Sequence, residues 1–466
     1  MTTYDLLVIG AGPGGTPAAM AAAQFGKTVL LVDKRDEPGG ECLFEGCIPS
    51  KILENAASRY AMLKAASEFH VTLQSGPQIH WEAVLKEKEQ ILAQRAAAAK
   101  ARLQQLPTLT FRQGTARFVD AHTVEIDGER FGFSHAIVAT GASAHLPPLA
   151  GGGVRRAWTN ADVFQSATLP EAIAFVGAGA ISCELAQMFA KLGVRCHVLE
   201  RGPRILRRLD EDAALAVQRR MQSQGIDVLL NVAFDAIEGD SGDFAVSYEQ
   251  SGEKHTLHVP QVLVATGRAA NVEGLGLETI GVAFDRHGIE TDETLCTSVP
   301  HIYAVGDCAK GPKFAHWASY QAGIAVHNIF APVNKRRVEF DKLSWVLFSD
   351  PQIASAGLDE AAAAARGMRV STERYDYRGD ARAQIDHETD GFVKFVIDED
   401  GGVIVGVQVV SADASSLAGE AALIVANKMN PMQVLGAIHP HPTLSEAFGA
   451  AARNRFMKTM MQRSRR

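Results

Sequence analysis

The residues best suited to chemistry are two cysteines, Cys42 and Cys47, in the segment GGECLFEGCIPSK. The pattern predicts a helix from about Cys47 to Leu63, so the second thiol stands at a helix N-terminus, which favours a thiolate. Two thiols five positions apart can close a redox-active disulfide. Two alternatives stay open: half of a zinc site, although no second Cys/His pair follows at suitable spacing, and a pair of buried structural cysteines.

A second candidate lies near the C-terminus, in the segment HPHPTLSE. His441 is followed five residues later by Glu446, and Pro442 stiffens the backbone between them. A histidine held in one tautomer by a carboxylate can act as a general base. Taken alone, the segment is better explained as a helix N-terminus capped by Thr443 or Ser445, with an acidic first turn.

The elements that must position these residues begin with a strand, turn, helix and strand in the first 33 residues. The strand YDLLVI leads into GAGPGG, a helix over about Thr16–Phe25 follows, and TVLLVD closes the unit. In such a βαβ unit the three glycines supply a tight turn, close approach to a pyrophosphate and close helix–strand packing, and the closing acid binds a ribose hydroxyl. Those residues here are Gly10, Gly12, Gly15 and Asp33.

A second copy of this unit begins at Ala172. The strand AIAFVG is followed by Gly177, Gly179 and Ser182 in the three glycine positions, then by a helix to about Leu192 and a strand that ends in Glu200. The third position tolerates a small side chain because its role is packing rather than phosphate contact. The chain is therefore predicted to bind two dinucleotides.

The rest of the chain completes an α/β fold with two Rossmann-like dinucleotide-binding domains. Two similar segments, AIVATGA and QVLVATGR, bring the chain back to a sheet edge and mark crossovers between domains, and residues 55–106 are helix-rich. From about residue 341 the pattern changes to short strands and one amphipathic helix over Gly419–Asn427. That change predicts a separate C-terminal α+β domain.

Composition excludes several classes of protein. The chain has 466 residues with 46 Lys and Arg against 53 Asp and Glu, a net charge of −7. No basic field attracts nucleic acid. The longest apolar stretch, residues 173–194, is interrupted by glycines, Glu184 and Lys191, so no membrane span is expected. The N-terminus shows no export signal, which predicts a cytoplasmic protein, and six scattered cysteines make no disulfide framework.

The order of these motifs resembles the class I pyridine nucleotide-disulfide oxidoreductases over nearly the whole chain. The resemblance rests on GAGPGG, GGECLFEGCIPSK, the two ATG crossovers, HIYAVGDCA, the pair Ala315–His316, SDPQIASAG and HPHPTLSE. It implies an FAD-binding domain in two parts (1–146 and 269–338), an NAD(P)-binding domain (147–268) and a C-terminal dimerisation domain (339–466).

The resemblance also implies two cofactors, FAD and NAD, and no metal. The residues implied for FAD are Gly10, Gly12, Gly15, Asp33, Lys51, Thr140, Gly141, Asp307 and Ala315. Those implied for NAD are Gly177, Gly179, Glu200 and Gly267. Glu200 favours NAD because a carboxylate repels a 2′-phosphate, but Arg201 and Arg207 stand where NADPH-using relatives carry phosphate-binding arginines, so NADP is not excluded.

Catalytic roles follow from the same resemblance. Cys47 would be the flavin-side thiol and Cys42 the interchange thiol that faces substrate. Lys51 would pair with Glu184 near the flavin. His441, oriented by Glu446, would reach the disulfide of the opposite subunit, so the active site is expected to be shared across a homodimer.

The activity that the resemblance implies is oxidation of dihydrolipoamide on a lipoyl-bearing carrier protein, with NAD⁺ as acceptor. One alternative is an NAD(P)H-dependent reductase of another disulfide, a quinone or a metal ion; another is a non-catalytic flavoprotein subunit or redox sensor. The chain also departs from the family, which usually has Thr at position 41 and Asn-Val at 44–45, where this sequence has Glu41, Phe44 and Glu45. Two added carboxylates are expected to raise thiol pKa values or repel anionic substrates.

Overall fold

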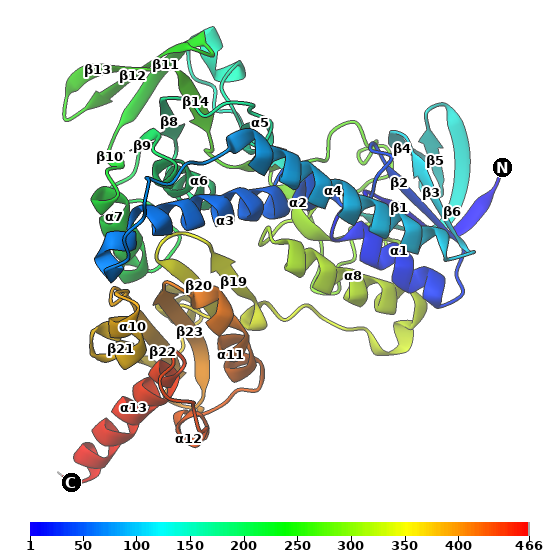
Figure 1. Cartoon of the computed structure of the whole chain (residues 1–466). Helices are drawn as coiled ribbons and strands as arrows, with labels where there is room; N and C mark the ends of the chain where they lie inside the picture. Colours follow the sequence, from blue (N-terminus) through cyan, green and yellow to red (C-terminus); the bar gives the residue numbers. More distant parts are fainter. Residues whose placement is uncertain (465–466) are drawn as a thin grey trace. The chain divides into compact units, whose positions relative to one another are not determined.

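The computed structural model describes residues 1–464, and its internal contacts divide the chain into two compact units (Figure 1). The first unit comprises Met1–Pro148, Val154–Pro170 and Leu263–Val338. The second comprises Leu149–Gly153, Glu171–Val262 and the chain from Glu339 onward. The four domain boundaries predicted from the sequence stay a prediction.

The first unit is built on a seven-stranded sheet with β1 (Thr3–Ile9) near its centre. β1 runs parallel to both of its neighbours, and its residues 6–9 are almost completely buried. The strands in spatial order are β3 (Leu109–Gln113), β2 (Val29–Asp33), β1, β6 (Glu129–Val138), β5 (Thr123–Ile126) and β4 (Ala116–Asp120), with β18 (Ile302–Ala304) beside β6. β3, β2, β1, β6 and β18 run parallel, as the predicted βαβ unit requires, and β5 and β4 extend the sheet as antiparallel strands.

Two helices, α1 (Gly15–Gln24) and α8 (Ala315–Phe330), pack side by side on this sheet (Figure 1). The buried positions of α1 are glycine and alanine, which let the helix approach β1 closely. Gly10, between β1 and α1, has φ +104°, a conformation that favours glycine. The glycine-rich segment therefore makes the tight turn that the sequence predicted.

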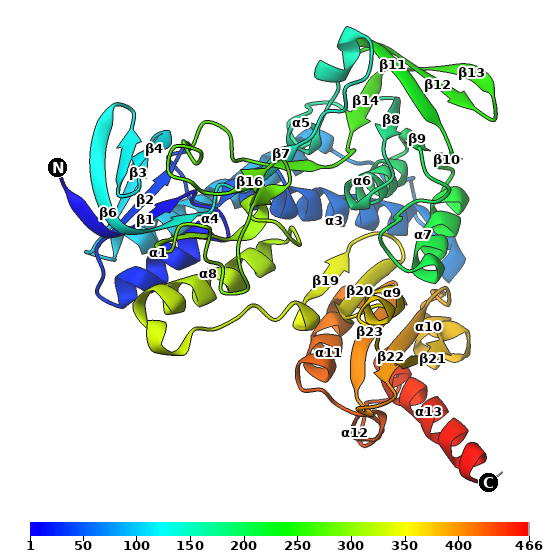
Figure 2. The same ribbon diagram turned by 180° about the vertical axis from the view of Figure 1, so that it is seen from behind.

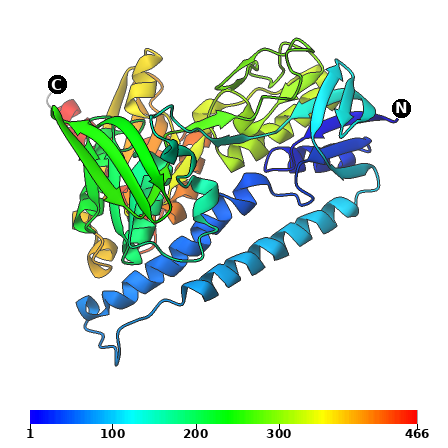
Figure 3. The ribbon, with the colours of Figure 1, turned by 90° about the horizontal axis from the view of Figure 1, so that it is seen from above.

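A short helix and two long ones follow β2. They are α2 (Gly40–Phe44), α3 (Cys47–Lys64) and α4 (Trp81–Gln104), and α3 and α4 run alongside each other (Figure 3). The helix predicted from Cys47 is confirmed. The two crossover segments also meet, because β7 (Ala142–Ala144) pairs antiparallel with β15 (Arg268–Ala270).

The second unit contains the second βαβ motif and the C-terminal segment. A sheet in the order β10-β9-β8-β14 carries α6 (Ala180–Lys191) and α7 (Glu211–Ser223), and a three-stranded meander follows. Its strands are β8 (Ala172–Val176), β9 (Arg195–Glu200), β10 (Asp227–Leu230), β14 (Gln261–Val264) and the meander β11 (Ala233–Asp240), β12 (Asp243–Gln250) and β13 (Glu253–Val259).

The C-terminal segment of the second unit is a five-stranded antiparallel sheet covered by helices (Figure 2). Its strands in order are β19 (Ser344–Leu347), β20 (Gln352–Gly357), β23 (Ile404–Ser411), β22 (Phe392–Asp398) and β21 (Val370–Asp376). Its helices are α9 (Glu360–Ala365), α10 (Ala381–Ile385), α11 (Ala414–Ala426), α12 (Pro431–Leu435) and α13 (Glu446–Ser464).

The prediction of one helix over Gly419–Asn427 was wrong in its start and in its count. α11 begins five residues earlier, at Ala414, because Asp413 and the two serines after Ala414 form its first turn rather than a loop. The other helices are short or begin in polar segments, where apolar periodicity gives little signal.

Among the described residues, no helix is long and apolar enough to cross a membrane.

The third glycine of the first motif yields a stability prediction. A Cβ at Gly15 would lie 1.7 Å from the Gly10 carbonyl oxygen, whereas a Cβ at Gly12 would meet only the Gly40 Cα, at 3.7 Å. We expect Gly15→Ala to lower the free energy of unfolding of the apoprotein by at least about 2 kcal/mol, because the helix must move away from β1. Urea denaturation followed by circular dichroism measures this.

Gly12→Ala is the matched control, and its loss of unfolding free energy is expected to stay below about 1 kcal/mol. Equal losses in the two variants would contradict the packing role assigned to Gly15.

Candidate active site

The loop that carries the two thiols is docked on the glycine-rich turn of the first unit. The Gly39 N–H donates to the Ala11 carbonyl at 2.8 Å. Gly40 has φ +59°, and a Cβ there would lie 2.7 Å from the Gly12 Cα. Only glycine allows this approach. The redox loop and the predicted pyrophosphate-binding turn therefore form one assembly.

Cys42 lies in α2, and Cys47 is the first residue of α3, an 18-residue helix. The two side chains are hydrogen bonded to each other. This contact, followed by burial and the charge of Cys47, raises the pKa of the Cys42 thiol. Cys47 is exposed, and its place at the helix N-terminus favours its thiolate. The pair is thus chemically asymmetric.

The two carboxylates beside the thiols each have an arginine partner. Glu41 is held by both terminal nitrogens of Arg268, one of them at 2.6 Å. Glu45 forms an ion pair with Arg35, whose guanidinium lies 5.1 Å from the centre of the Phe44 ring. These arginines offset part of the added negative charge, and the expected effect of the two carboxylates on the thiol pKa values and on anionic substrates stays a prediction.

The two βαβ motifs repeat the same hydrogen bonds. The Ala11 N–H donates to Asp33 at 2.6 Å, and the Ala178 N–H donates to Glu200 at 2.9 Å, each across 22 residues. In both motifs the second carboxylate oxygen accepts from the N–H two residues further on, that of Arg35 or of Gly202. Each acid thus braces its glycine turn as well as standing where a ribose would bind.

The first turn fits an FAD pyrophosphate. No side chain caps α1, so the positive end of the helix dipole faces the turn, and the space beside Gly12 admits a close backbone approach. The other predicted FAD residues also lie in the first unit. Thr140 donates to the Asn271 carbonyl at 2.7 Å, Gly141 follows it, Asp307 lies 3.7 Å from Arg268, and Ala315 begins α8.

Burial raises the pKa of Asp307, and the charges of Arg268 and Lys313 oppose that shift. Lys313 also donates to the Asp307 carbonyl at 2.6 Å. A partly buried acid with two cations near it suits a group that bonds polyol hydroxyls.

The second turn fits the pyrophosphate of a nicotinamide dinucleotide. Gly179 caps α6 without a side-chain hydrogen bond, and a Cβ there would meet open space. Ser182 is fully buried, unlike Gly15, whose position has no room for a Cβ. Arg207 lies over Gly202, so it packs on the turn that follows Glu200. Gly267, the fourth predicted NAD residue, lies in the first unit, with φ +150°.

The C-terminal histidines form two histidine–glutamate pairs in the second unit. His441 Nδ1 lies 3.1 Å from both carboxylate oxygens of Glu446, and the His441 side chain is 70% exposed. Glu446 also accepts from the Thr443 N–H at 3.0 Å and begins α13, so the acidic first turn is confirmed, whereas the role of His441 as a base stays a prediction. The second pair, His439 Nε2 with Glu420 at 2.8 Å, was missed because Glu420 lies on a separate helix.

The Glu446 carboxylate stays charged at neutral pH. The hydrogen bond from Thr443, followed by the contact with His441, lowers its pKa below the ordinary value of 4.5. A lowered folded-state pKa means that the contact stabilises the fold above pH 4.5 and is lost only as the pH falls through the lower value. His441 therefore stays oriented throughout the neutral range.

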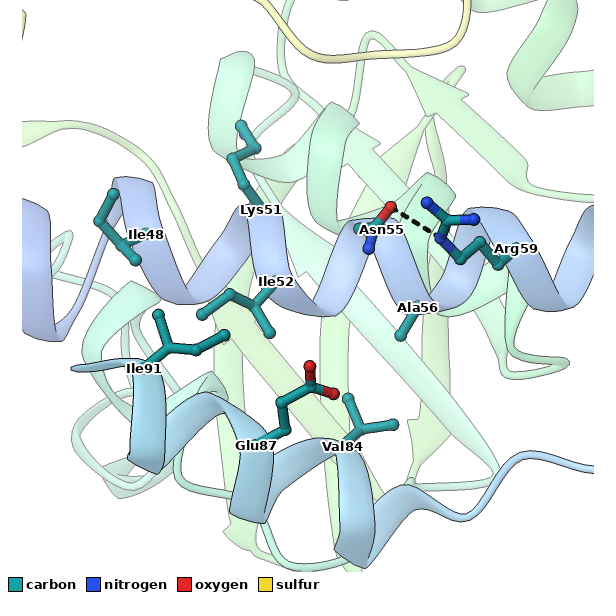
Figure 4. A pocket seen from close by; sticks show the side chains of 9 residues that line it. All are labelled: Ile48, Lys51, Ile52, Asn55, Ala56, Arg59, Val84, Glu87 and Ile91. Atoms are coloured by element: carbon teal, nitrogen blue, oxygen red, sulfur yellow. Dashed lines mark hydrogen bonds between the residues drawn. The ribbon is translucent and has the colours of Figure 1, made fainter. Parts of the chain in front are cut away.

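Lys51 lies on α3 in the first unit and Glu184 on α6 in the second, where Glu184 accepts from the Phe348 N–H at 2.8 Å. Their pairing stays a prediction. Figure 4 shows Lys51 extending away from α4 at the edge of a groove of about 540 Å³. The groove begins at Ile48, next to Cys47, and is lined by α3 and α4.

Among the described residues, no cluster of three or more His, Cys, Asp or Glu side chains could hold a metal ion.

Sequence reasoning missed the polar partners of the redox loop. Asn160 donates to Glu41 at 2.7 Å and to the Glu45 carbonyl at 3.1 Å, and Arg268 holds Glu41 from 227 positions away. The only signal in the sequence was Glu41 itself, a charged residue where the family has Thr. A charge in a partly buried loop requires a partner.

A thiol pair docked on one dinucleotide turn, together with a second such turn, defines an oxidoreductase that couples thiols to a pyridine nucleotide. The comparisons with known proteins agree. The family described as pyridine nucleotide-disulphide oxidoreductase matches residues 4–322, and its dimerisation domain matches residues 343–452. The chain belongs to this family, whose members use FAD and NAD(H).

Several similar curated proteins are dihydrolipoyl dehydrogenases. The chain is 33% identical over 454 residues to the dihydrolipoyl dehydrogenase of Geobacillus stearothermophilus, which covers 96% of this chain and 95% of that protein. It is 34% identical to the dihydrolipoyl dehydrogenase of Haloferax volcanii, covering 97% and 96%.

A similar solved structure is the HOCl-induced flavoprotein disulfide reductase RclA from Escherichia coli. It matches with a TM-score of 0.85 at 23% identity, over 96% of this chain and 99% of that one. At this identity the likeness concerns the fold.

The asymmetry of the thiols predicts how they react. The hydrogen bond with Cys47 is the largest cause of the raised Cys42 pKa, so Cys47→Ala is expected to lower that pKa. More Cys42 thiolate is then present at pH 8, and alkylation of Cys42 by iodoacetamide in the reduced protein becomes about tenfold faster for each unit of pKa change. Rates against pH, with the modified residue mapped by mass spectrometry, measure this.

Cys296→Ala, which removes a distant thiol in the same unit, is the control and is expected to leave the Cys42 profile unchanged. A Cys42 profile that stays the same in Cys47→Ala would contradict the assignment.

Proposed function

We propose that this protein is a dihydrolipoyl dehydrogenase, which oxidises the dihydrolipoyl group of a carrier protein and reduces NAD⁺. The observation that carries the proposal is the asymmetric thiol pair docked on the first dinucleotide turn. The relatives that share this name at 32–34% identity cover nearly the whole chain, which supports the same substrate.

The asymmetry assigns the two sulfurs. In thiol–disulfide exchange the thiol with the lower pKa leaves more easily. Cys47 stands at the N-terminus of α3, which stabilises the thiolate that leaves, whereas the pKa of Cys42 is raised. A substrate thiolate therefore attacks the sulfur of Cys42 and releases Cys47. The second substrate thiol then displaces Cys42, leaving an oxidised lipoyl ring and two protein thiols.

His441 supplies the base for this exchange. With Nδ1–H donated to Glu446, the Nε2 lone pair is directed away from the carboxylate and can take the proton of the substrate thiol. We propose that the pair serves the thiols of the opposite subunit, which requires the homodimer expected of a chain with the family's dimerisation domain.

The remaining residues hold the cofactors. The turn with Gly10, Gly12 and Asp33, together with Asp307, would hold FAD, and the turn with Gly177, Gly179 and Glu200 would hold NAD. When bound, these groups relay two electrons from the thiols to the nicotinamide. In sum, the dihydrolipoyl group and NAD⁺ give the lipoyl disulfide, NADH and one proton. We also propose a cytoplasmic location, where a reducing environment suits a redox-active thiol pair.

The test of this proposal is steady-state reduction of NAD⁺ by dihydrolipoamide. We expect turnover in the wild type, loss of at least about 10³-fold in Cys42→Ser, and a preference for NAD⁺ over NADP⁺ of at least about tenfold, because Glu200 repels a 2′-phosphate. Cys296→Ser is the control and keeps full activity. Turnover of another disulfide, with none of dihydrolipoamide, would contradict the proposal.

The two histidine–glutamate pairs offer an internal comparison. We expect His441→Gln to lower kcat by about 10²- to 10³-fold and Glu446→Gln by about tenfold, since the first removes the base and the second only its orientation. His439→Gln removes the other, more buried histidine and is expected to lower kcat less than about threefold. An equal loss in His439→Gln and His441→Gln would argue against His441 as the base.

A further inference from the structure

The strongest feature that the proposed function leaves unused is the polar network around Glu41, the residue before Cys42. The Glu41 carboxylate accepts from Nη1 and Nη2 of Arg268 and, at 2.7 Å, from Asn160. Asn160 is buried, and about a quarter of the Glu41 side chain is exposed. All these residues belong to the first unit.

Arg268 connects this carboxylate with two other parts of the site. It donates to the Ala142 carbonyl, and its Nη2 lies 3.7 Å from Asp307. Its Nε is buried and has no hydrogen-bond partner in the described part of the chain. The guanidinium is therefore fixed in one orientation by acceptors on α2, on β7 and by the nearby Asp307.

The same guanidinium lies within electrostatic range of the redox pair. Burial lowers the pKa of Arg268, but the hydrogen bond and charge of Glu41, followed by the charges of Asp307 and Cys47, raise it to above the ordinary value. A cation that is stabilised by charge on Cys47 must in turn stabilise that charge.

We propose that Glu41 is a positioning residue of the redox centre, which fixes Arg268 beside the Cys42–Cys47 pair and balances the positive charge that Arg268 directs at Cys47. The ion pair between Glu41 and Arg268 also ties α2 to β15. The loop that carries Cys42 therefore keeps its place when the bond between the two sulfurs opens. This inference rests on the thiol pair of the proposed function and does not depend on which disulfide substrate the pair serves.

Other charged groups near the two thiols stay unchanged when Glu41 or Arg268 is replaced. They are Glu45 directly after α2, Lys51 on α3, Arg95 on α4, and Asp307 and Lys313 from the segment before α8. The effect of Glu41 must therefore be measured as a difference between variants at one site.

The experiment measures the pH midpoint of Cys47 alkylation by iodoacetamide in the dithiothreitol-reduced holoenzyme. Glu41→Gln removes the balancing charge, so the midpoint is expected to move about half a unit lower, with alkylation about threefold faster below the midpoint. Arg268→Met removes the cation, so the midpoint is expected to move about half a unit higher. Opposite shifts identify an electrostatic role, because mere loosening of α2 would move both variants in the same direction.

Controls keep the test decisive. Glu41→Asp keeps the charge and is expected to return the midpoint to within about 0.2 units of the wild type. Glu45→Gln removes a carboxylate directly after the same helix, with similar exposure but paired with Arg35, and it is expected to leave the Cys47 midpoint unchanged. Thermal melting and flavin absorbance report whether each variant folds and keeps its cofactor.

Shifts in the same direction for Glu41→Gln and Arg268→Met, or no shift in either folded variant, would overturn the inference. Because alkylation requires no lipoyl substrate, absence of turnover with dihydrolipoamide would end the proposed function and leave this result standing.

Discussion

The rest of the site depends on the close approach between the redox loop and the first glycine-rich turn. The Gly39 N–H donates to the Ala11 carbonyl, and Gly40 lies so close to Gly12 that a Cβ at position 40 would clash with the Gly12 Cα. This contact places a thiol pair beside a dinucleotide-binding turn without any flexible linker. It also fixes where α3 begins, and with it the exposed Cys47 thiol at the helix N-terminus.

Around this contact, the charges are arranged in balanced sets. Glu41 with Arg268, and Glu45 with Arg35, keep the loop close to neutral although it contains two carboxylates. A partly buried ion pair contributes little net stability, but removing one partner is costly because the other charge is left unpaired. Such pairs therefore fix the positions of their side chains more than they stabilise the fold. The polarity of the thiol pair then arises from the helix N-terminus, the mutual hydrogen bond and burial.

Much of this arrangement follows from local sequence pattern. The two βαβ units, the start of α3 at Cys47 and the contact of His441 with Glu446 all depend on residues within about 35 positions of one another, where periodicity and turn chemistry give a signal. The partners of Glu41 could not be predicted in the same way. Arg268 lies 227 positions away, and its approach depends on the pairing of β7 with β15. The His439–Glu420 contact spans only 19 positions, but it joins a loop to a separate helix, so apolar periodicity gave no signal for it.

The central claim is that a pyridine nucleotide exchanges two electrons with the Cys42–Cys47 disulfide. Its most direct measurement is anaerobic titration of the oxidised holoenzyme with one equivalent of NADH per subunit, followed by differential alkylation and mass mapping of all six cysteines. The account predicts two new thiols per subunit, at Cys42 and Cys47, with the other four cysteines unchanged. Oxidation of NADH with no new thiol at these two positions would contradict it.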